Sequence, residues 1–225
     1  LAVVQFHLSI PWLASGGYVG VDVFFVISGF LITSIIVEAI DSGKYSIADF
    51  YERRIRRIFP ALFAVYAFIL LMSLLIMYPA ETGRIGQTIL SSEYFISNIF
   101  FSHSAGYFDV LTKNNPALHT WSLSVEEQFY VFFPLFMFAI VALGRKWRKP
   151  LIALALVGLF VLSASWVNIS QNQAFYLVQF RAWELLVGSA LAVGLVPSTK
   201  NQNLAEAIGI AGLGAILYAV FFYDE

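Results

Sequence analysis

The sequence predicts an all-α protein: a polytopic transmembrane helical bundle with about seven spans plus one interfacial or partly inserted helix. Composition is the first reason, because 60% of the 225 residues are hydrophobic and 12% are charged. Soluble domains are about 45–50% apolar and about 25% charged, so lipid must be the solvent for much of this surface. The second reason is that several apolar stretches approach the roughly 20 residues that a helix needs to cross a bilayer. Aromatic residues reach 17%, which suits lipid contact and interfacial anchoring.

The expected spans follow one another along the chain. They lie at residues 1–13, 19–40, 58–78, 129–143, 151–167, 175–195 and 207–222. The first is the end of a truncated span, and the fourth begins at residue 129 or as early as Leu123. Because the chain opens inside one apolar run and closes just after another, we expect it to be part of a longer membrane protein.

Two basic clusters predict the orientation of these spans. They contain eight of the 13 Lys and Arg residues: Arg53, Arg54, Arg56 and Arg57, and Arg145, Lys146, Arg148 and Lys149. Cytoplasmic loops are rich in Lys and Arg, so both clusters are expected in the cytoplasm, with an even number of crossings between them. The weakly apolar segment 85–101 would make that number odd, so we expect it to be the interfacial or partly inserted helix on the outer side. The alternative is that it crosses fully and leaves one basic cluster outside.

The stretch of residues 119–128 is unusually polar for the start of a span, and this topology places it on the outer side, away from the arginines. Carboxylates near hydrocarbon are costly, so they usually serve a pathway or a reaction. Glu126 and Glu127 point about 100° apart on a helix and cannot both face one pocket. Glu126 shares a face with Ser122 and Tyr130 and is the first choice for a pocket, whereas Glu127 is also explained as an interfacial charge at a helix start.

His7 and Asp22 are polar residues within or near the first two spans. An imidazole is the natural general base or acid near neutral pH, and inside a membrane we favour that role for His7 over simple packing. Asp22 could orient His7 across the turn between the spans, or it could be a carboxylate favoured by the helix dipole. The glycines around Asp22 would allow close helix packing or a tight turn.

Two further sets of charges have both a structural and a functional explanation. Arginine offers planar donor forks that suit phosphate, and Arg53 and Arg57 lie on one side of a helix, but lipid headgroup contact explains the same cluster. Arg181 and Glu184 are three residues apart and can form an intramembrane ion pair. That pair is either purely structural or places one charge in a shared outer pocket.

Several chemistries are excluded by what the sequence lacks. There is no cysteine, which excludes disulfides, thiolate metal sites and a cysteine acyl-enzyme. No Gly-rich phosphate loop, HExxH motif or Cys/His metal pattern is present, so no metal site is expected. The net charge of −1 gives no reason to expect nucleic-acid binding.

Four stretches together resemble the membrane-bound acyltransferase 3 family, whose members O-acetylate bacterial surface polysaccharides. They are residues 3–7 with 17–33 (GYVGVDVFFVISGFLIT), 50–60 (FYERRIRRIFP), 119–134 (HTWSLSVEEQFYVFFP) and 181–188 (RAWELLVG). They occur in the family's order over nearly the whole chain. His7 matches a histidine that the family places after an arginine in its first helix, and that arginine would precede Leu1. Residues 1–225 are therefore expected to be a partial acyltransferase 3 transmembrane domain, with the first helix and C-terminal helices incomplete or missing.

The resemblance implies a multi-pass protein of the bacterial inner membrane that transfers an acyl group from cytoplasmic acyl-CoA to an extracytoplasmic glycan. Acyl-CoA, with acetyl-CoA expected, is a co-substrate rather than a tightly bound cofactor. The implied partners are membrane lipid, acyl-CoA and a carbohydrate or glycolipid acceptor. The alternative from another class is a proton-coupled transporter or a lipid-linked glycan flippase.

The resemblance also implies a role for each candidate residue. The donor phosphates would be held by Arg53, Arg54, Arg56 and Arg57. His7 would deprotonate the acceptor hydroxyl or carry the acyl group transiently, with Glu126 and Asp22 orienting or charge-balancing it. The acceptor would be bound by Glu127, Ser122, Trp121, Arg181 and Glu184.

Overall fold

A computed structural model describes residues 16–103, 114–197 and 199–223. Every regular element in these residues is helical, as the composition predicted. The elements are α2 (Val19–Asp41), α3 (Ile47–Ile76), α4 (Pro79–Glu93), α5 (Ser97–Ser102), α7 (Thr120–Leu143), a 3-10 turn (Arg145–Trp147), α8 (Arg148–Trp166), α9 (Gln171–Tyr176), α10 (Val178–Ala192) and α11 (Gln202–Phe222).

Five helical stretches in the described residues are long and apolar enough to cross a membrane. They are α2, α3, α7, α11 and the 3-10 turn continued by α8 (Arg145–Trp166). The predicted span at residues 1–13 lies outside the described residues. The predicted span at 175–195 is interrupted, because Leu177 is extended and divides it into α9 and α10. The expected number of about seven spans is therefore not confirmed.

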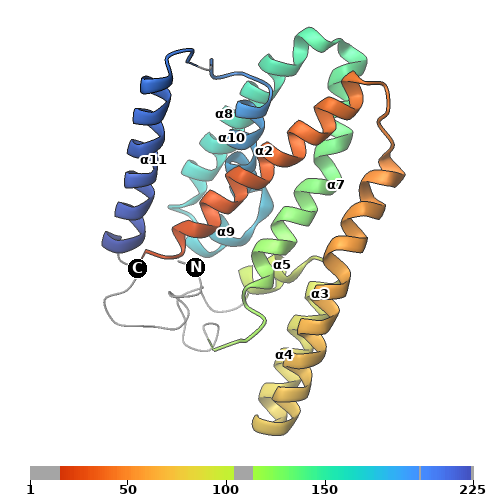
Figure 1. Cartoon of the computed structure of the whole chain (residues 1–225). Coiled ribbons are helices and arrows are strands. Elements are labelled where there is room, and N and C mark those ends of the chain that lie inside the picture. Colours follow the sequence, from red (N-terminus) through yellow and green to blue (C-terminus); the bar gives the residue numbers. More distant parts are fainter. Residues whose placement is uncertain (1–15, 104–113, 198, 224–225) are drawn as a thin grey trace.

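The long helices alternate in direction, as Figure 1 shows. Helices α2, α7, α8 and α10 pack together, α11 lies at one edge and the α3–α4 hairpin at the other. Their upper connections carry many of the basic residues: Lys44, Arg145, Lys146, Arg148, Lys149 and Lys200. We call this the basic end. There Asp41 pairs with Arg148 at 2.8 Å and with Arg145 at 3.6 Å, which ties α2 to the start of α8.

The weakly apolar segment 85–101 does not form a span. It contributes to α4 and α5, and the turn between them includes Phe95, whose φ is +53°. Both helices are too short to cross a bilayer, so α3 and α7 remain as the candidate spans between the two basic clusters. This segment therefore contains no candidate span, and its predicted place at the membrane interface stays a prediction.

Helix α3 is long and is displaced along the bundle. Its 30 residues extend roughly 45 Å at 1.5 Å per residue, and α4 folds back against its C-terminal half. The Ser46 side chain accepts a hydrogen bond from the Asp49 backbone N–H, which caps its first turn. The hydroxyl of Tyr51 donates to the carbonyl of Tyr130 at 3.2 Å and so holds α3 in its register beside α7.

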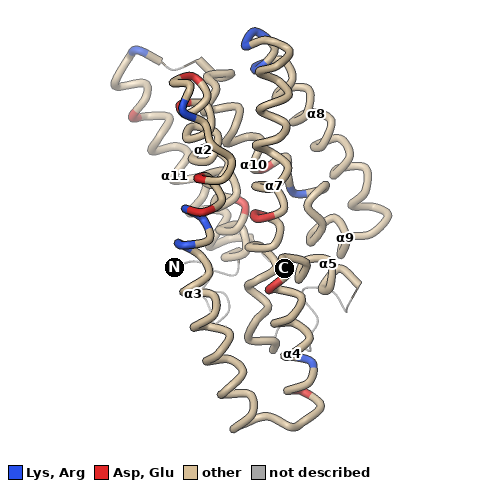
Figure 2. Tube along the Cα trace, turned by 90° about the vertical axis from the view of Figure 1, so that its right-hand side faces the viewer, with Lys and Arg blue, Asp and Glu red and all other residues tan. Residues whose placement is uncertain are grey.

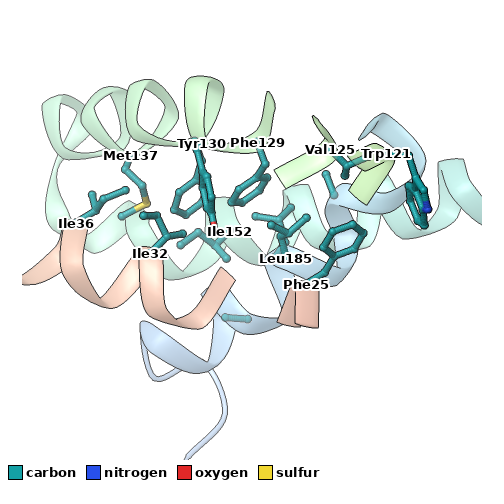
Figure 3. Packing of buried hydrophobic residues seen from close by; sticks show 14 of the residues in the cluster. Phe25, Ile32, Ile36, Trp121, Val125, Phe129, Tyr130, Met137, Ile152 and Leu185 are labelled. Atoms are coloured by element: carbon teal, nitrogen blue, oxygen red, sulfur yellow. The ribbon is translucent and has the colours of Figure 1, made fainter. Parts of the chain in front are cut away.

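The packed core lies between α2, α7, α8 and α10, where Figure 3 shows Ile32, Met137, Ile152 and Leu185 pointing into the space between the helices. Helices α2 and α10 approach most closely at two glycines. A Cβ on Gly29 would lie 1.9 Å from the Leu185 carbonyl oxygen, and one on Gly188 would lie 1.9 Å from that of Val26. The close helix packing expected from the glycine-rich second span is confirmed.

Candidate functional site

A groove lined by both apolar and polar side chains opens between α2, α3 and α7. Its cavity is about 690 Å³, large enough to hold part of an organic ligand. Its polar side chains come from all three helices and are Ser28, Arg53, Arg54, Arg57, Glu126 and Tyr130. We call this cavity the α2–α3–α7 groove.

Glu126 is the buried acid of the groove. It is 6% exposed, and its Oε1 accepts hydrogen bonds from the hydroxyls of both Ser28 and Tyr130. Ser28 comes from α2 and Tyr130 lies one turn further along α7. The carboxylate is therefore fixed at the point where α2 and α7 meet.

Arg54 lies beside this acid but pairs with its neighbour in sequence. Its Nη2 is 3.1 Å from Glu127 Oε1, and its Cζ is 3.3 Å from the centre of the Tyr130 ring. Glu127 lines a second cavity of about 380 Å³ between α3, α7 and the α4–α5 turn. Arg54 lines both cavities, so its guanidinium forms part of the wall between them.

The two glutamates behave as helical geometry predicted, because Glu126 faces the groove and Glu127 faces the second cavity. Ser122 does not share the groove with Glu126. Its hydroxyl donates to the His119 carbonyl at 3.1 Å, one turn back on the same helix. The groove instead receives Ser28 from α2, which our sequence analysis did not select. A serine within a largely apolar span was the available signal, which Thr33 and Ser34 share.

The expected separation of the arginines from the glutamates is wrong. Arg53, Arg54 and Arg57 line the same groove as Glu126. Figure 2 shows basic positions on α3 level with acidic positions on α7. The physical reason is the displacement of α3, which places its second and third turns beside the N-terminal half of α7. The sequence predicted the crossings of these helices but not their relative height.

Arg56 differs from the other three arginines. It points away from the groove and pairs with Glu52 at 2.7 Å, one turn earlier on α3, where both side chains are exposed. The cluster predicted as a single phosphate site is thus divided by the helix into three residues that face the groove and one that does not.

A second charged cluster surrounds Arg181 on α10. Its Nη1 is 3.0 Å from Glu184, which confirms the predicted ion pair, and its Nη2 donates to Asp22 of α2. The rings of Phe25, Trp121 and Phe175 surround its Cζ at 5.6, 5.9 and 5.4 Å. Arg181 therefore joins α2 and α10 through charges enclosed by aromatic rings.

Trp121, a predicted acceptor-binding residue, and Asp22, predicted to orient His7, both belong to this second cluster. Trp121 is buried in the core, packed against Phe25 and Tyr176, so it forms part of the wall behind Arg181. Asp22 contacts Arg181, whereas its expected contact with His7 is untested because His7 lies outside the described residues.

Other polar side chains in residues 119–128 connect α7 to α4 and α5 through hydrogen bonds. Gln128 and Asn98 exchange amide hydrogen bonds at 2.9 and 3.2 Å. A chain of hydroxyls runs through Ser92, Thr120, Ser97 and Ser124. Buried polar groups need partners, and this network supplies them where the chain folds back from α3 towards α7. These residues have a structural explanation.

Comparison with known proteins adds to this geometry. A sequence model described as an acyltransferase domain, that of the acyltransferase 3 family, matches residues 1–225. The chain belongs to the acyltransferase 3 family. This acyltransferase 3 chain is also 32% identical to the peptidoglycan O-acetyltransferase OatA of Listeria monocytogenes, over 99% of the chain. The YrhL protein of Bacillus subtilis is 33% identical over 100% of the chain.

The relatives differ in how far they extend beyond this acyltransferase 3 chain. A Haemophilus influenzae protein without an assigned function is 39% identical over 80% of the chain, and the match covers 77% of that protein. The matches cover 37% of the Listeria protein and 37% of the Bacillus protein. No solved structure matches the chain.

Proposed function

We propose that this chain forms the transfer site of a membrane O-acyltransferase, which moves an acyl group from acyl-CoA to a hydroxyl of a cell-surface glycan. The observation that carries the proposal is the shared groove: three arginines of α3 and the buried Glu126 line one cavity. A donor rich in phosphate needs the arginines, and activation of a hydroxyl needs a base or a group that positions one. Residues 1–225 would form part of the acyltransferase 3 transmembrane domain of the whole protein.

The arginines are suited to an anionic donor because they are not all neutralised. Arg54 is paired with Glu127, but Arg53 and Arg57 are exposed along the groove. Guanidinium forks hold phosphates in bidentate fashion, which would place the donor's phosphates on α3 and its acyl end towards Glu126. Acetyl is the expected acyl group because the Listeria relative is named as an O-acetyltransferase.

The acceptor side of the proposal combines His7 with the acids. His7 would be the catalytic base or a transient acyl carrier, with Glu126 holding or balancing it. Glu127 and Arg181 would contribute charge near the acceptor, while Trp121 and Glu184, which are buried, would shape that side of the site. The acceptor class is a glycan of the cell surface, by analogy with the peptidoglycan activity in the Listeria protein's name.

The cellular setting completes the proposal. Several long apolar helices fit a membrane protein, and the Lys- and Arg-rich basic end would face the cytoplasm of a multi-pass inner-membrane protein. The donor would then enter from the basic end and the acceptor from the other. Because the α3 arginines lie in the same cavity as Glu126, the two substrates would meet in the α2–α3–α7 groove rather than at opposite faces.

The test uses the full-length protein that contains this chain, purified in detergent and supplied with acetyl-CoA and a glycan acceptor. We expect acetyl-CoA consumption and a glycan heavier by one acetyl group. The double variant R53A/R57A should raise KM for acetyl-CoA by about tenfold or more, equal to about 1.4 kcal/mol of binding. The matched control is R56A, which removes an arginine of the same helix that faces away from the groove. A protein that transports a solute and leaves acetyl-CoA intact would overturn the proposal.

A further inference from the structure

Ser28 has a chemical environment that its neighbours on α2 lack. The other α2 residues that line the groove are apolar: Phe24, Ile27, Leu31, Ile32 and Ile35. Among the α2 residues that line the groove, Ser28 carries the hydroxyl, and its Oγ donates directly to the Glu126 carboxylate. A hydroxyl in hydrogen-bond contact with a carboxylate is the arrangement of a nucleophile with its general base.

We propose that Ser28 is a nucleophile that accepts the acyl group from the donor and passes it to the acceptor hydroxyl, with Glu126 as its base. This inference rests on the proposed function. It places a covalent step within the groove, and it assigns to Ser28 and Glu126 the acyl-carrier and base roles that the proposed function gives to His7.

The reaction balances with the groups present in the groove and the donor itself. Glu126 takes the hydroxyl proton as Ser28 Oγ attacks the thioester carbonyl, and the C–S bond breaks. The leaving thiolate receives the proton from Glu126, which gives free CoA thiol and an acyl ester on Ser28. The acceptor hydroxyl then attacks the ester while Glu126 takes its proton, and the Ser28 oxygen leaves and recovers that proton.

The surrounding charges support both halves of this step. Arg54 and Arg57 line the groove beside Glu126, where a guanidinium can stabilise the negative charge that develops on the carbonyl oxygen or thiolate. Tyr130 donates to the same carboxylate oxygen as Ser28, which orients the base.

The experiment is to trap the ester in the full-length protein. Without acceptor, the protein is incubated with isotope-labelled acetyl-CoA, quenched in acid, digested and analysed by mass spectrometry. We expect one labelled acetyl group on Ser28, lost in S28A and in E126Q. With acceptor, S28A should lower the transfer rate by roughly 100-fold or more. The matched control is S34A on the same helix, whose hydroxyl bonds the Phe30 carbonyl and should leave the rate unchanged.

Failure of this inference is separable from failure of the proposed function. If the wild type turns over acetyl-CoA while S28A keeps a large part of the rate, or if the label lies on Tyr130 or another side chain, Ser28 is not the nucleophile and the acyltransferase proposal stands. If the wild type consumes no acetyl-CoA, both fall. S28C guards against misfolding, because a folded S28C protein should carry the label as a thioester, and an unlabelled one overturns the inference.

Discussion

The ion pair between Arg54 and Glu127 joins α3 to α7 at 3.1 Å and lies in the wall between two cavities. Glu127 is the sequence neighbour of the groove acid Glu126, yet the α-helix turns it towards the other cavity. The pair therefore fixes how α3 lies beside α7, and with it the position of the arginines that line the groove.

Removal of one partner of this pair should destabilise the protein more than removal of both. E127L leaves the partly buried Arg54 without its carboxylate, which costs about 3–5 kcal/mol by analogy with other buried pairs. Replacing both partners, in R54M/E127L, should recover much of that loss because neither charge remains. Thermal unfolding in detergent of R54M, of E127L and of the double variant gives the coupling energy between the two side chains. A coupling near zero would show that the pair does not hold α3.

Replacement of Arg54 by lysine should weaken the binding of acetyl-CoA. Lysine keeps the charge but loses the planar fork and most of the stacking over Tyr130. We expect R54K to remain folded and to show a raised KM for acetyl-CoA, by several-fold to about tenfold. R56K, on the exposed side of α3, is the matched control. Equal KM values for R54K and the wild type would contradict a role for the fork in donor binding.

The α2–α10 contact should tolerate no side chain at Gly29. In G29A the new Cβ would meet the Leu185 backbone at 1.9 Å, and backbone cannot move aside as a flexible side chain would. Overpacking of this kind costs about 1–3 kcal/mol and more where helices must separate. We expect a lower thermal midpoint and weaker expression. G158A on α8 is the control, because a Cβ there meets nothing within 4 Å.

Arg181 should be needed for stability as well as for the shape of the site. R181A leaves Asp22 and the buried Glu184 facing each other without a cation, at a cost of about 3–5 kcal/mol. The triple variant D22N/R181M/E184Q should recover part of the stability because it removes all three charges. R145A, whose exposed pair with Asp41 measures 3.6 Å, should change the midpoint little. A midpoint for R181A equal to that of R145A would contradict this account.

The Gln128–Asn98 exchange should hold α5 against α7. Q128A removes both halves of the exchange and a 2.7 Å bond to the Phe95 carbonyl, and it leaves the Asn98 amide partly unpaired. An unsatisfied buried amide costs about 1–3 kcal/mol. We expect faster hydrogen exchange or proteolysis at the α4–α5 turn. Q171A, at the exposed start of α9, provides a comparison; equal protection of the turn in both variants would contradict the prediction.

Local pattern was enough to predict much of the candidate site. The (i, i+3) spacing of Arg181 and Glu184 predicted their ion pair, and the 100° step between neighbours predicted that Glu126 and Glu127 would face different cavities. Ser28 could not be selected in the same way, because its importance depends on Glu126, which lies 98 residues away in the chain. No local periodicity reports such a contact.

The sequence by itself determined that lipid surrounds much of this protein and that its chain forms helices. Hydrophobic stretches of sufficient length specify helices in lipid, because each backbone polar group must then find its partner within its own segment. Tertiary structure alone decided the height of α3 beside α7. That height depends on Tyr51 bonding the Tyr130 carbonyl and on Arg54 pairing with Glu127, which are contacts between distant segments. Those contacts place the arginines and the buried acid in one groove, although charge topology predicted them apart.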